Sequence, residues 1–228
     1  LIKTYGNGIE EWSQTFGGVG NDYGTSVQQT NDGGYIITGR TRIVPSPMPV
    51  VYLIKTDGNG DSLWTKIFGD STTIERGSCV KQTGDGGYII TGQAQKEAVS
   101  YDLDVYLIKT DGNGDSLWTK TFGGTGEDYG LSVQQTNDGG YIISGKTGLL
   151  NAGDPEDVYL IKTNGNGDSL WTKTFGGSAN EEGRSVQQTT DGGYIITGST
   201  ESFGSGDFDI YLIKTYGNGI EEWSQTFG

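Results

Sequence analysis

The chain has 228 residues, and 15 lysines and arginines against 29 aspartates and glutamates give it a net charge of −14. This charge argues against binding to nucleic acid or to anionic lipid, both of which attract basic side chains. The chain has no histidine, which excludes histidine-based catalysis and histidine-ligated metals. Its single cysteine excludes an internal disulfide and a cysteine-based zinc site. The sequence contains no run of about 18 apolar residues, so it predicts no membrane-spanning helix.

The first 12 residues are one copy of a motif that occurs five times. Its fullest form, at 53–64, reads LIKTDGNGDSLW, a β-branched run followed by a glycine-rich turn and a second apolar run. This pattern is typical of a β-hairpin, so we predict strands at 51–56 and 63–68 around a turn at 57–60. The copies cover residues 1–12, 53–64, 107–118, 160–171 and 212–223.

A second motif alternates with the first and begins at Ser26. It reads SVQQTNDGGYIITG, and its tyrosines recur every 53 residues. The Asn-Asp-Gly-Gly segment at 31–34 predicts a hairpin turn, because glycine accepts positive φ without strain. We therefore predict strands at 27–30 and 35–38. The copies cover residues 26–39, 79–92, 132–145 and 185–198.

Four short strands in each repeat of about 53 residues predict an all-β fold, a β-propeller of four-stranded antiparallel blades. A linear β-solenoid is the competing architecture, but its repeats are usually shorter. The predicted units form one propeller domain or a propeller fragment over 1–228. They are a half-blade hairpin at 1–17 and blades at 18–69, 70–123, 124–176 and 177–228.

The repeats resemble a secreted bacterial β-propeller repeat. The resemblance rests on the segment FGGTGEDYG at 122–130, the turn DGGY at 138–141 and the exit SGKT at 144–147, and all four copies match its outline. Residues 57–64 also look like the tryptophan-docking motif of quinoprotein propellers. The resemblance implies a propeller on a secreted or cell-surface protein of a bacterium or archaeon, and it implies no activity because a fold does not determine a function.

The first 17 residues are identical to the last 17. Three arrangements follow from this identity. The chain is one period of a longer array, or a four-bladed ring closed by residues 1–17, or a unit whose spare hairpin docks on a neighbouring copy. The third arrangement favours exchange between molecules, and a contact that does not close gives a fibre.

The turns of the first motif offer side-chain oxygens at alternate positions, the spacing that calcium loops use. The alternative is a plain hairpin turn in which Asn-Gly supplies the positive φ. We expect calcium as the one cofactor, if any. The candidate ligands are Asp57, Asn59 and Asp61 in one turn and Asp111, Asn113 and Asp115 in the next.

One acidic residue precedes the first strand of every repeat, at spacings of 53. If these strands line a central channel, the four carboxylates form an axial ring that holds a cation or raises the pKa of one member. The alternative is that each carboxylate accepts hydrogen bonds from its own glycine-rich loop. The ring would consist of Asp22, Glu75, Asp128 and Glu181.

The variable segments that follow the second motif are where binding sites usually lie on a rigid scaffold. Tyr101, Phe203 and Phe208 are candidates to stack on a sugar ring, with simple solvent exposure as the alternative. Cys79 has no histidine to activate it, so we expect a small buried thiol. The turn aspartates at 32, 85, 138 and 191 are explained by Asx turns and receive no function.

These observations predict a non-catalytic extracellular propeller with a structural or adhesive role, which assembles by sharing blade strands with other copies of itself or with adjoining repeats. The alternative is a lectin-like propeller with one weak glycan site per blade. An enzyme of the quinoprotein or sialidase type is disfavoured, since the near-symmetric repeats offer no unique constellation. The arginines at 40, 42, 76 and 184 suggest no cluster.

Overall fold

The computed structural model describes residues 1–97, 102–148 and 155–228. Within them the chain forms 18 strands connected by turns. The strands are β1 (Ile2–Thr4), β2 (Glu10–Ser13), β3 (Tyr23–Gln29), β4 (Tyr35–Arg42), β5 (Pro49–Thr56), β6 (Ser62–Phe68), β7 (Glu75–Gln82), β8 (Tyr88–Gln95), β9 (Leu103–Thr110), β10 (Ser116–Phe122), β11 (Tyr129–Gln135), β12 (Tyr141–Thr147), β13 (Asp157–Thr163), β14 (Ser169–Phe175), β15 (Glu181–Gln188), β16 (Tyr194–Thr200), β17 (Asp209–Thr215) and β18 (Glu221–Phe227).

The described strands group into four antiparallel four-stranded sheets and one two-stranded sheet. We name them sheet 1 (β3–β6), sheet 2 (β7–β10), sheet 3 (β11–β14), sheet 4 (β15–β18) and the terminal hairpin (β1–β2). Each sheet follows chain order from its first strand to its fourth. The prediction of an all-β fold made of repeated four-stranded antiparallel units is confirmed.

The strands are longer than the sequence pattern suggested, because residues without a β-type composition also pair. In sheet 1 the first strand starts at Tyr23 rather than at residue 27, since Tyr23 and Gly24 lie opposite Arg40 and Gly39 of β4. The register shifts between Gly24 and Ser26, and the other sheets shift at the equivalent place. This bulge bends the first strand of every sheet in the same way.

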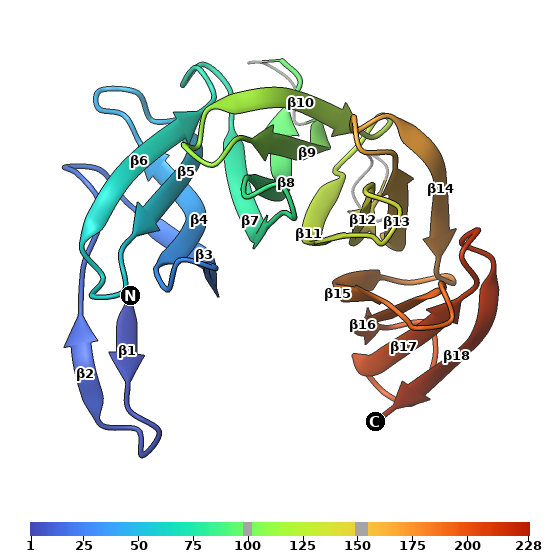
Figure 1. Cartoon of the computed structure of the whole chain (residues 1–228). Coiled ribbons are helices and arrows are strands. Elements are labelled where there is room, and N and C mark those ends of the chain that lie inside the picture. Colours follow the sequence, from blue (N-terminus) through green and yellow to red (C-terminus); the bar gives the residue numbers. More distant parts are fainter. Residues whose placement is uncertain (98–101, 149–154) are drawn as a thin grey trace.

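The four sheets fan out along an open arc, with the terminal hairpin beyond sheet 1 at one end and sheet 4 at the other (Figure 1). The first strands of consecutive sheets contact one another on the inside of the arc, in the order β3, β7, β11 and β15. Among the described strands, β1 and β2 pair with each other and with no strand of sheet 4. A four-bladed ring closed by residues 1–17 is therefore not the arrangement in this structure.

The hydrophobic core lies between consecutive sheets. Ile36, Val51 and Leu53 of sheet 1 pack against Val80 and Tyr88 of sheet 2, and equivalent side chains fill the next two junctions. The second and third strands of a sheet therefore need apolar residues on both faces. This requirement explains the nearly continuous burial of the third strands β5 and β9. Each fully buried side chain of this kind stabilises the fold by about 1.5–3 kcal/mol. Within the described residues there is no helix long and apolar enough to span a membrane.

Candidate functional sites

At every junction a tryptophan packs into a socket, which consists of a tyrosine and a turn glycine of the following sheet. Trp64 at the end of sheet 1 meets Tyr88 of sheet 2 edge to face, with ring centroids 5.9 Å apart. Its ring lies over Gly114, where an added Cβ would lie 2.6 Å from the indole. Gly114 also has a φ of 79°, so both conformation and space require glycine. The other tryptophan–tyrosine pairs are Trp12–Tyr35, Trp118–Tyr141 and Trp171–Tyr194.

A buried lysine follows the apolar run of the third strand in each sheet. Lys55 is 3% exposed, and its Nζ donates to Asp32 Oδ1 at 3.1 Å and to the Thr56 carbonyl at 2.8 Å. Hydrogen bonds from Lys55 and Thr30 lower the pKa of Asp32 to about 2. The expected Asx turn is present, since the Gly34 N–H donates to Asp32 at 3.0 Å. The lysine is a partner that the sequence pattern did not indicate. The equivalent ion pairs are Lys109–Asp85, Lys162–Asp138 and Lys214–Asp191.

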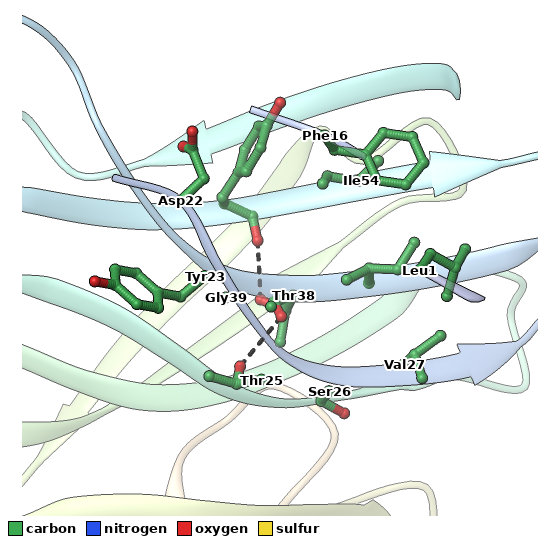
Figure 2. A pocket seen from close by; sticks show the side chains of 13 residues that line it. Leu1, Phe16, Asp22, Tyr23, Thr25, Ser26, Val27, Thr38, Gly39 and Ile54 are labelled. Atoms are coloured by element: carbon green, nitrogen blue, oxygen red, sulfur yellow. Dashed lines mark hydrogen bonds between the residues drawn. The ribbon is translucent and has the colours of Figure 1, made fainter. Parts of the chain in front are cut away.

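Sheet 1 has an open face on the side away from sheet 2. A pocket of about 330 Å³ lies there, and Figure 2 shows Leu1 and Phe16 of the N-terminal segment beside Val27 and Ile54 of sheet 1 around it. Val27 is 51% exposed, whereas its equivalent in sheet 2, Val80, is fully buried against sheet 1. The terminal hairpin therefore covers this face only in part.

Sheet 4 has an open face of complementary composition. Ile210 and Phe227 are 56% and 50% exposed, although their equivalents Val51, Val105 and Val158, and Phe68, Phe122 and Phe175, are buried or half-buried at the junctions. Trp223 is 39% exposed and has no tyrosine partner among the described residues. The two open faces are thus the two halves of the interface that the chain builds three times internally.

The turns proposed for calcium are closed by their own hydrogen bonds. Asp57 Oδ1 accepts the N–H groups of Asn59 at 2.8 Å and Asp61 at 2.9 Å, and Asp111 does the same for Asn113 and Asp115. Asp115 also forms an ion pair with a lysine of sheet 1, Lys66. Among the described residues no group of three or more carboxylate or cysteine side chains is placed to hold a metal. Calcium at these turns stays a prediction that no contact here supports.

The four carboxylates expected to form an axial ring are each held in their own loop. Asp22, Asp128 and Glu181 accept backbone N–H groups of Gly18, Gly124 and Gly177 at 2.8–3.0 Å, and Glu75 accepts the Thr73 hydroxyl. The alternative of loop capping accounts for these contacts. Among the described residues the four do not form a cluster placed to hold a metal, so the ring stays a prediction without support.

One of these carboxylates has a neighbour that the sequence did not pair with it. Asp104 at the start of β9 and Asp128 at the start of sheet 3 both lie against Gly123. Burial raises the pKa of Asp128, and the nearby Asp104 adds to the shift. The pKa of Asp104 is raised by burial as well, although an ion pair with Lys96 at 3.0 Å opposes the shift. These two carboxylates therefore lie together where sheets 2 and 3 meet, and Asp128 Oδ1 is buried without a hydrogen-bond partner among the described residues.

The remaining candidates lie apart from one another. Cys79 is a free thiol, half-buried rather than buried, at the edge of the core between sheets 2 and 3. Phe203 and Phe208 are exposed between β16 and β17, and Tyr101 lies outside the described residues. The first strands line a polar axial cavity of about 640 Å³. Glutamine side chains such as Gln28 cross it to accept backbone N–H groups of the next sheet, a pattern that sequence reasoning missed.

The expectation that the arginines form no cluster is wrong for three of them. Arg40, Arg42 and Arg76 line one small pocket at the junction of sheets 1 and 2. Arg40 and Arg76 are 36 positions apart in the sequence, and they meet because their strands belong to adjacent sheets.

The chain has distant similarity to known proteins. No family model matches the chain. The chain is 26% identical over 207 residues to the regulatory protein FlaEY of Caulobacter vibrioides, an alignment that covers 80% of this chain and spans 21% of that protein's length.

Among solved structures, the chain is similar to a candidate exo-β-1,3-galactanase from Bifidobacterium bifidum. The TM-score is 0.53 at 13% sequence identity, covering 91% of this chain and 72% of that one. A tail fibre of a Staphylococcus aureus phage aligns over 86% of this chain and 50% of its own, with a TM-score of 0.28 and 10% identity. The first similarity shows a shared fold, and the second is too low to carry an argument.

Proposed function

We propose that this chain is a non-catalytic β-propeller module of an extracellular or cell-surface protein, with a structural or adhesive role that it performs by stacking on other copies of itself. The observation that carries the proposal is the pair of open faces. Positions whose apolar side chains are buried at all three junctions, as Val80 is, carry exposed side chains on the two end sheets. Val27 on sheet 1 and Ile210 on sheet 4 are examples. Contiguous exposed apolar surface of this kind usually marks an interaction site.

The identical segments 1–17 and 212–228 explain how the two faces would join. Trp12 occupies the socket of Tyr35 and Gly60 on sheet 1. Trp223 carries the same side chain in the same local sequence on sheet 4. When sheet 4 of one copy stacks on sheet 1 of another, Trp223 takes the place of Trp12, and β15 and β16 fill the space beside Val27 that the terminal hairpin leaves open.

The terminal hairpin is the segment that gives way in this exchange. β1 has three residues and pairs only with β2 among the described strands, whereas β17 pairs with β16 over seven residues. On sheet 1, the hairpin is held by the Trp12–Tyr35 contact and by a hydrogen bond of 3.4 Å from Gln14 to Asp61. Displacing it therefore costs much less than removing β17 from sheet 4.

The test compares two substitutions in identical sequence surroundings. In the full chain, Trp223→Ala should weaken self-association by roughly 30-fold, because truncating a central interface tryptophan typically costs at least 2 kcal/mol. Trp12→Ala should strengthen it, because the competing hairpin no longer holds the socket. Molar mass measured by light scattering over a range of concentrations gives both results, and circular dichroism checks that each variant is folded.

Two outcomes would contradict the proposal. A wild-type chain and a Trp12→Ala variant that both stay at 24.3 kDa at the highest soluble concentration would rule out assembly by stacking. Weaker association in Trp12→Ala but not in Trp223→Ala would show that the terminal hairpin, rather than sheet 4, is the donor.

A second candidate function is glycan binding, which the fold shared with a candidate galactanase favours. Phe203 and Phe208 present exposed rings between β16 and β17. The Phe203 ring packs against the Tyr211 ring, with the two ring centroids 5.5 Å apart. Titration of wild type and Phe208→Ala with β-1,3-galactan oligosaccharides should show binding that the variant loses. Release of free galactose from these oligosaccharides would overturn the non-catalytic assignment.

A further inference from the structure

Three arginines converge on one pocket at the junction of sheets 1 and 2. Arg40 and Arg42 come from the end of β4, and Arg76 comes from the start of β7. Together with Asn21, Tyr23 and Pro49 they line a cavity of about 90 Å³. The whole chain carries only four arginines and has a net charge of −14. Three of these four arginines in one pocket are therefore a local concentration of positive charge in an acidic protein.

Within the described residues, no ion pair neutralises these three guanidinium groups. Among the described residues none of the three lies within 4.0 Å of a carboxylate oxygen, whereas the fourth arginine, Arg184, pairs with Glu182 at 2.6 Å. The Arg76 Nε is buried and has no hydrogen-bond partner there. Glu127 attracts Arg76 from a greater distance, but its carboxylate accepts the Tyr129 hydroxyl at 2.7 Å. Within the described part of the chain, the pocket therefore holds charged donors without a carboxylate partner.

The arginines are held in place by the fold. The Arg40 guanidinium lies 4.3 Å from the centroid of the Tyr23 ring, which faces it across the strand pair. Arg42 lies opposite the buried Pro49 of β5. Burial lowers the pKa of Arg76, and repulsion from Arg40 adds to the shift. The cluster thus carries an unfavourable charge interaction that a bound anion would relieve.

The cluster occurs at one junction although the repeats are nearly identical. The positions of Arg40 and Arg42 hold Gln93 and Gln95 in the second repeat, Lys146 and Gly148 in the third, and Ser199 and Glu201 in the fourth. Lys146 also lies over a tyrosine ring, but it is paired with Glu156. The position of Arg76 is a tyrosine in the first and third repeats and Glu182 in the fourth. The packing that the four sheets share therefore does not account for three arginines at this junction, and a binding role would explain them.

We propose that Arg40, Arg42 and Arg76 form a binding site for a compact oxyanion: the carboxylate or sulfate group of an acidic sugar, or a free inorganic oxyanion. Guanidinium groups present forked N–H donors that match such oxyanions. The pocket is far smaller than the 300–1,000 Å³ typical of sites that enclose a whole small molecule, so it takes the charged group alone. Polyanions such as nucleic acid are disfavoured by the net charge of −14 of the whole chain.

The experiment measures thermal unfolding of the full chain in sodium sulfate, sodium phosphate, glucuronate and galactose 6-sulfate, each compared with chloride at equal ionic strength. Neutral galactose is included as well. A ligand that binds only the folded state raises the unfolding midpoint. The wild type should show a rise with at least one oxyanion beyond that in chloride, and isothermal titration should give a saturable isotherm with one site.

The matched control separates this site from general salt effects, since sulfate stabilises most proteins by exclusion from their surface. Arg76→Gln and Arg184→Gln each remove one arginine, but only Arg76 lies in the pocket. Arg76→Gln should lose most of the specific rise and weaken binding by at least tenfold, and Arg184→Gln should keep both. If Arg76→Gln does not fold, Arg42→Gln replaces it as the test variant, because Arg42 is an exposed member of the cluster. It should likewise weaken oxyanion binding.

Three results would be decisive against the site. Equal responses of wild type, Arg76→Gln and Arg184→Gln would assign the stabilisation to general salt effects. A response to chloride as large as to the oxyanions would remove the chemical specificity. Binding of galactose with the same affinity as galactose 6-sulfate would show that the sugar ring, rather than its charged group, is recognised. A response to acidic sugars well above that to inorganic sulfate would identify the sugar as the source of the anion.

Discussion

At the scale of single residues, the buried lysines show how one side chain fixes the ends of several strands. Lys55 reaches from β5 to the turn between β3 and β4 and to the carbonyl that ends its own strand. Its Nζ is buried, while more than half of the Asp32 side chain is exposed. Removing the carboxylate therefore leaves a buried ammonium with fewer acceptors, whereas the carboxylate itself loses little from being in water.

This pair predicts a pH dependence of stability. The folded-state pKa of Asp32 is lowered from 3.8 to about 2, so its stabilising contribution is present above the unfolded value and is lost as the pH falls through about 2. At neutral pH, Asp32→Asn should lower the free energy of unfolding by about 1 kcal/mol, a value that allows for solvent screening. Urea unfolding across a pH series should show this difference shrinking between about pH 4 and pH 2.

The control for this prediction is Asp207→Asn, which removes an exposed carboxylate of the β16–β17 loop that forms no ion pair within the described part of the chain. Its effect on unfolding should be small at every pH. A difference between wild type and Asp32→Asn that stays constant down to pH 2 would refute the role of the carboxylate charge.

At the scale of elements, the hairpin between the third and fourth strands of each sheet acts as both turn and socket. Its glycine needs positive φ to close the turn and needs no Cβ where a tryptophan of the preceding sheet lies over it. Gly114 meets both requirements, since Trp64 covers it. Gly8 occupies the same place in the terminal hairpin with a φ of 82°, but nothing lies within 4 Å of its Cβ position.

This contrast separates the two requirements by experiment. Gly114→Ala and Gly8→Ala both force alanine into the left-handed region, at a cost of about 1–2 kcal/mol. Gly114→Ala also pushes on the Trp64 ring and should lose a further 1–3 kcal/mol or so. Gly114→Ala should therefore lower the midpoint of chemical denaturation further than Gly8→Ala does. Equal destabilisation by the two variants would mean that the turn conformation alone matters.

The elements were predictable from sequence to different degrees, for physical reasons. Runs of β-branched and apolar residues and glycine-rich turns are local signals, so the hairpins and the four-stranded repeat follow from them. Strand starts such as Tyr23 were missed because the pairing of β3 with β4, rather than local composition, extends the strand. The arginine cluster was missed because Arg40 and Arg76 meet through the packing of two sheets, which no local pattern encodes.

At the scale of the whole molecule, the charge of −14 opposes the stacking of identical copies. The open faces themselves are apolar, with side chains such as Val27 and Ile210 exposed. Long-range repulsion between acidic copies is screened by salt, whose Debye length is about 10 Å at 0.1 M. Hydrophobic contact between the faces does not depend on such screening.

Self-association of the full chain should therefore strengthen as sodium chloride is raised, by roughly a few-fold between low and physiological ionic strength. Sedimentation velocity at fixed protein concentration measures the effect. The Trp223→Ala variant should show little association at any salt concentration. Association that weakens with salt would indicate that ion pairs, rather than apolar faces, hold the copies together.

In the proposed stack, the tryptophan sockets would set a polarity. Four of the five tryptophans dock on the sheet that follows them in the chain, as Trp64 does on Tyr88. Trp223 has no such partner among the described residues, so one open face offers an indole and the other offers the receptor that Trp12 occupies. Like faces cannot join, and any assembly grows with two chemically distinct ends. A copy without the indole at 223 would still receive a neighbour on its sheet 1, but its sheet 4 would keep only apolar side chains such as Ile210 and Phe227 for the next contact. Such a copy would slow or stop growth at that end, and its proportion in a mixture would set the length of the assembly.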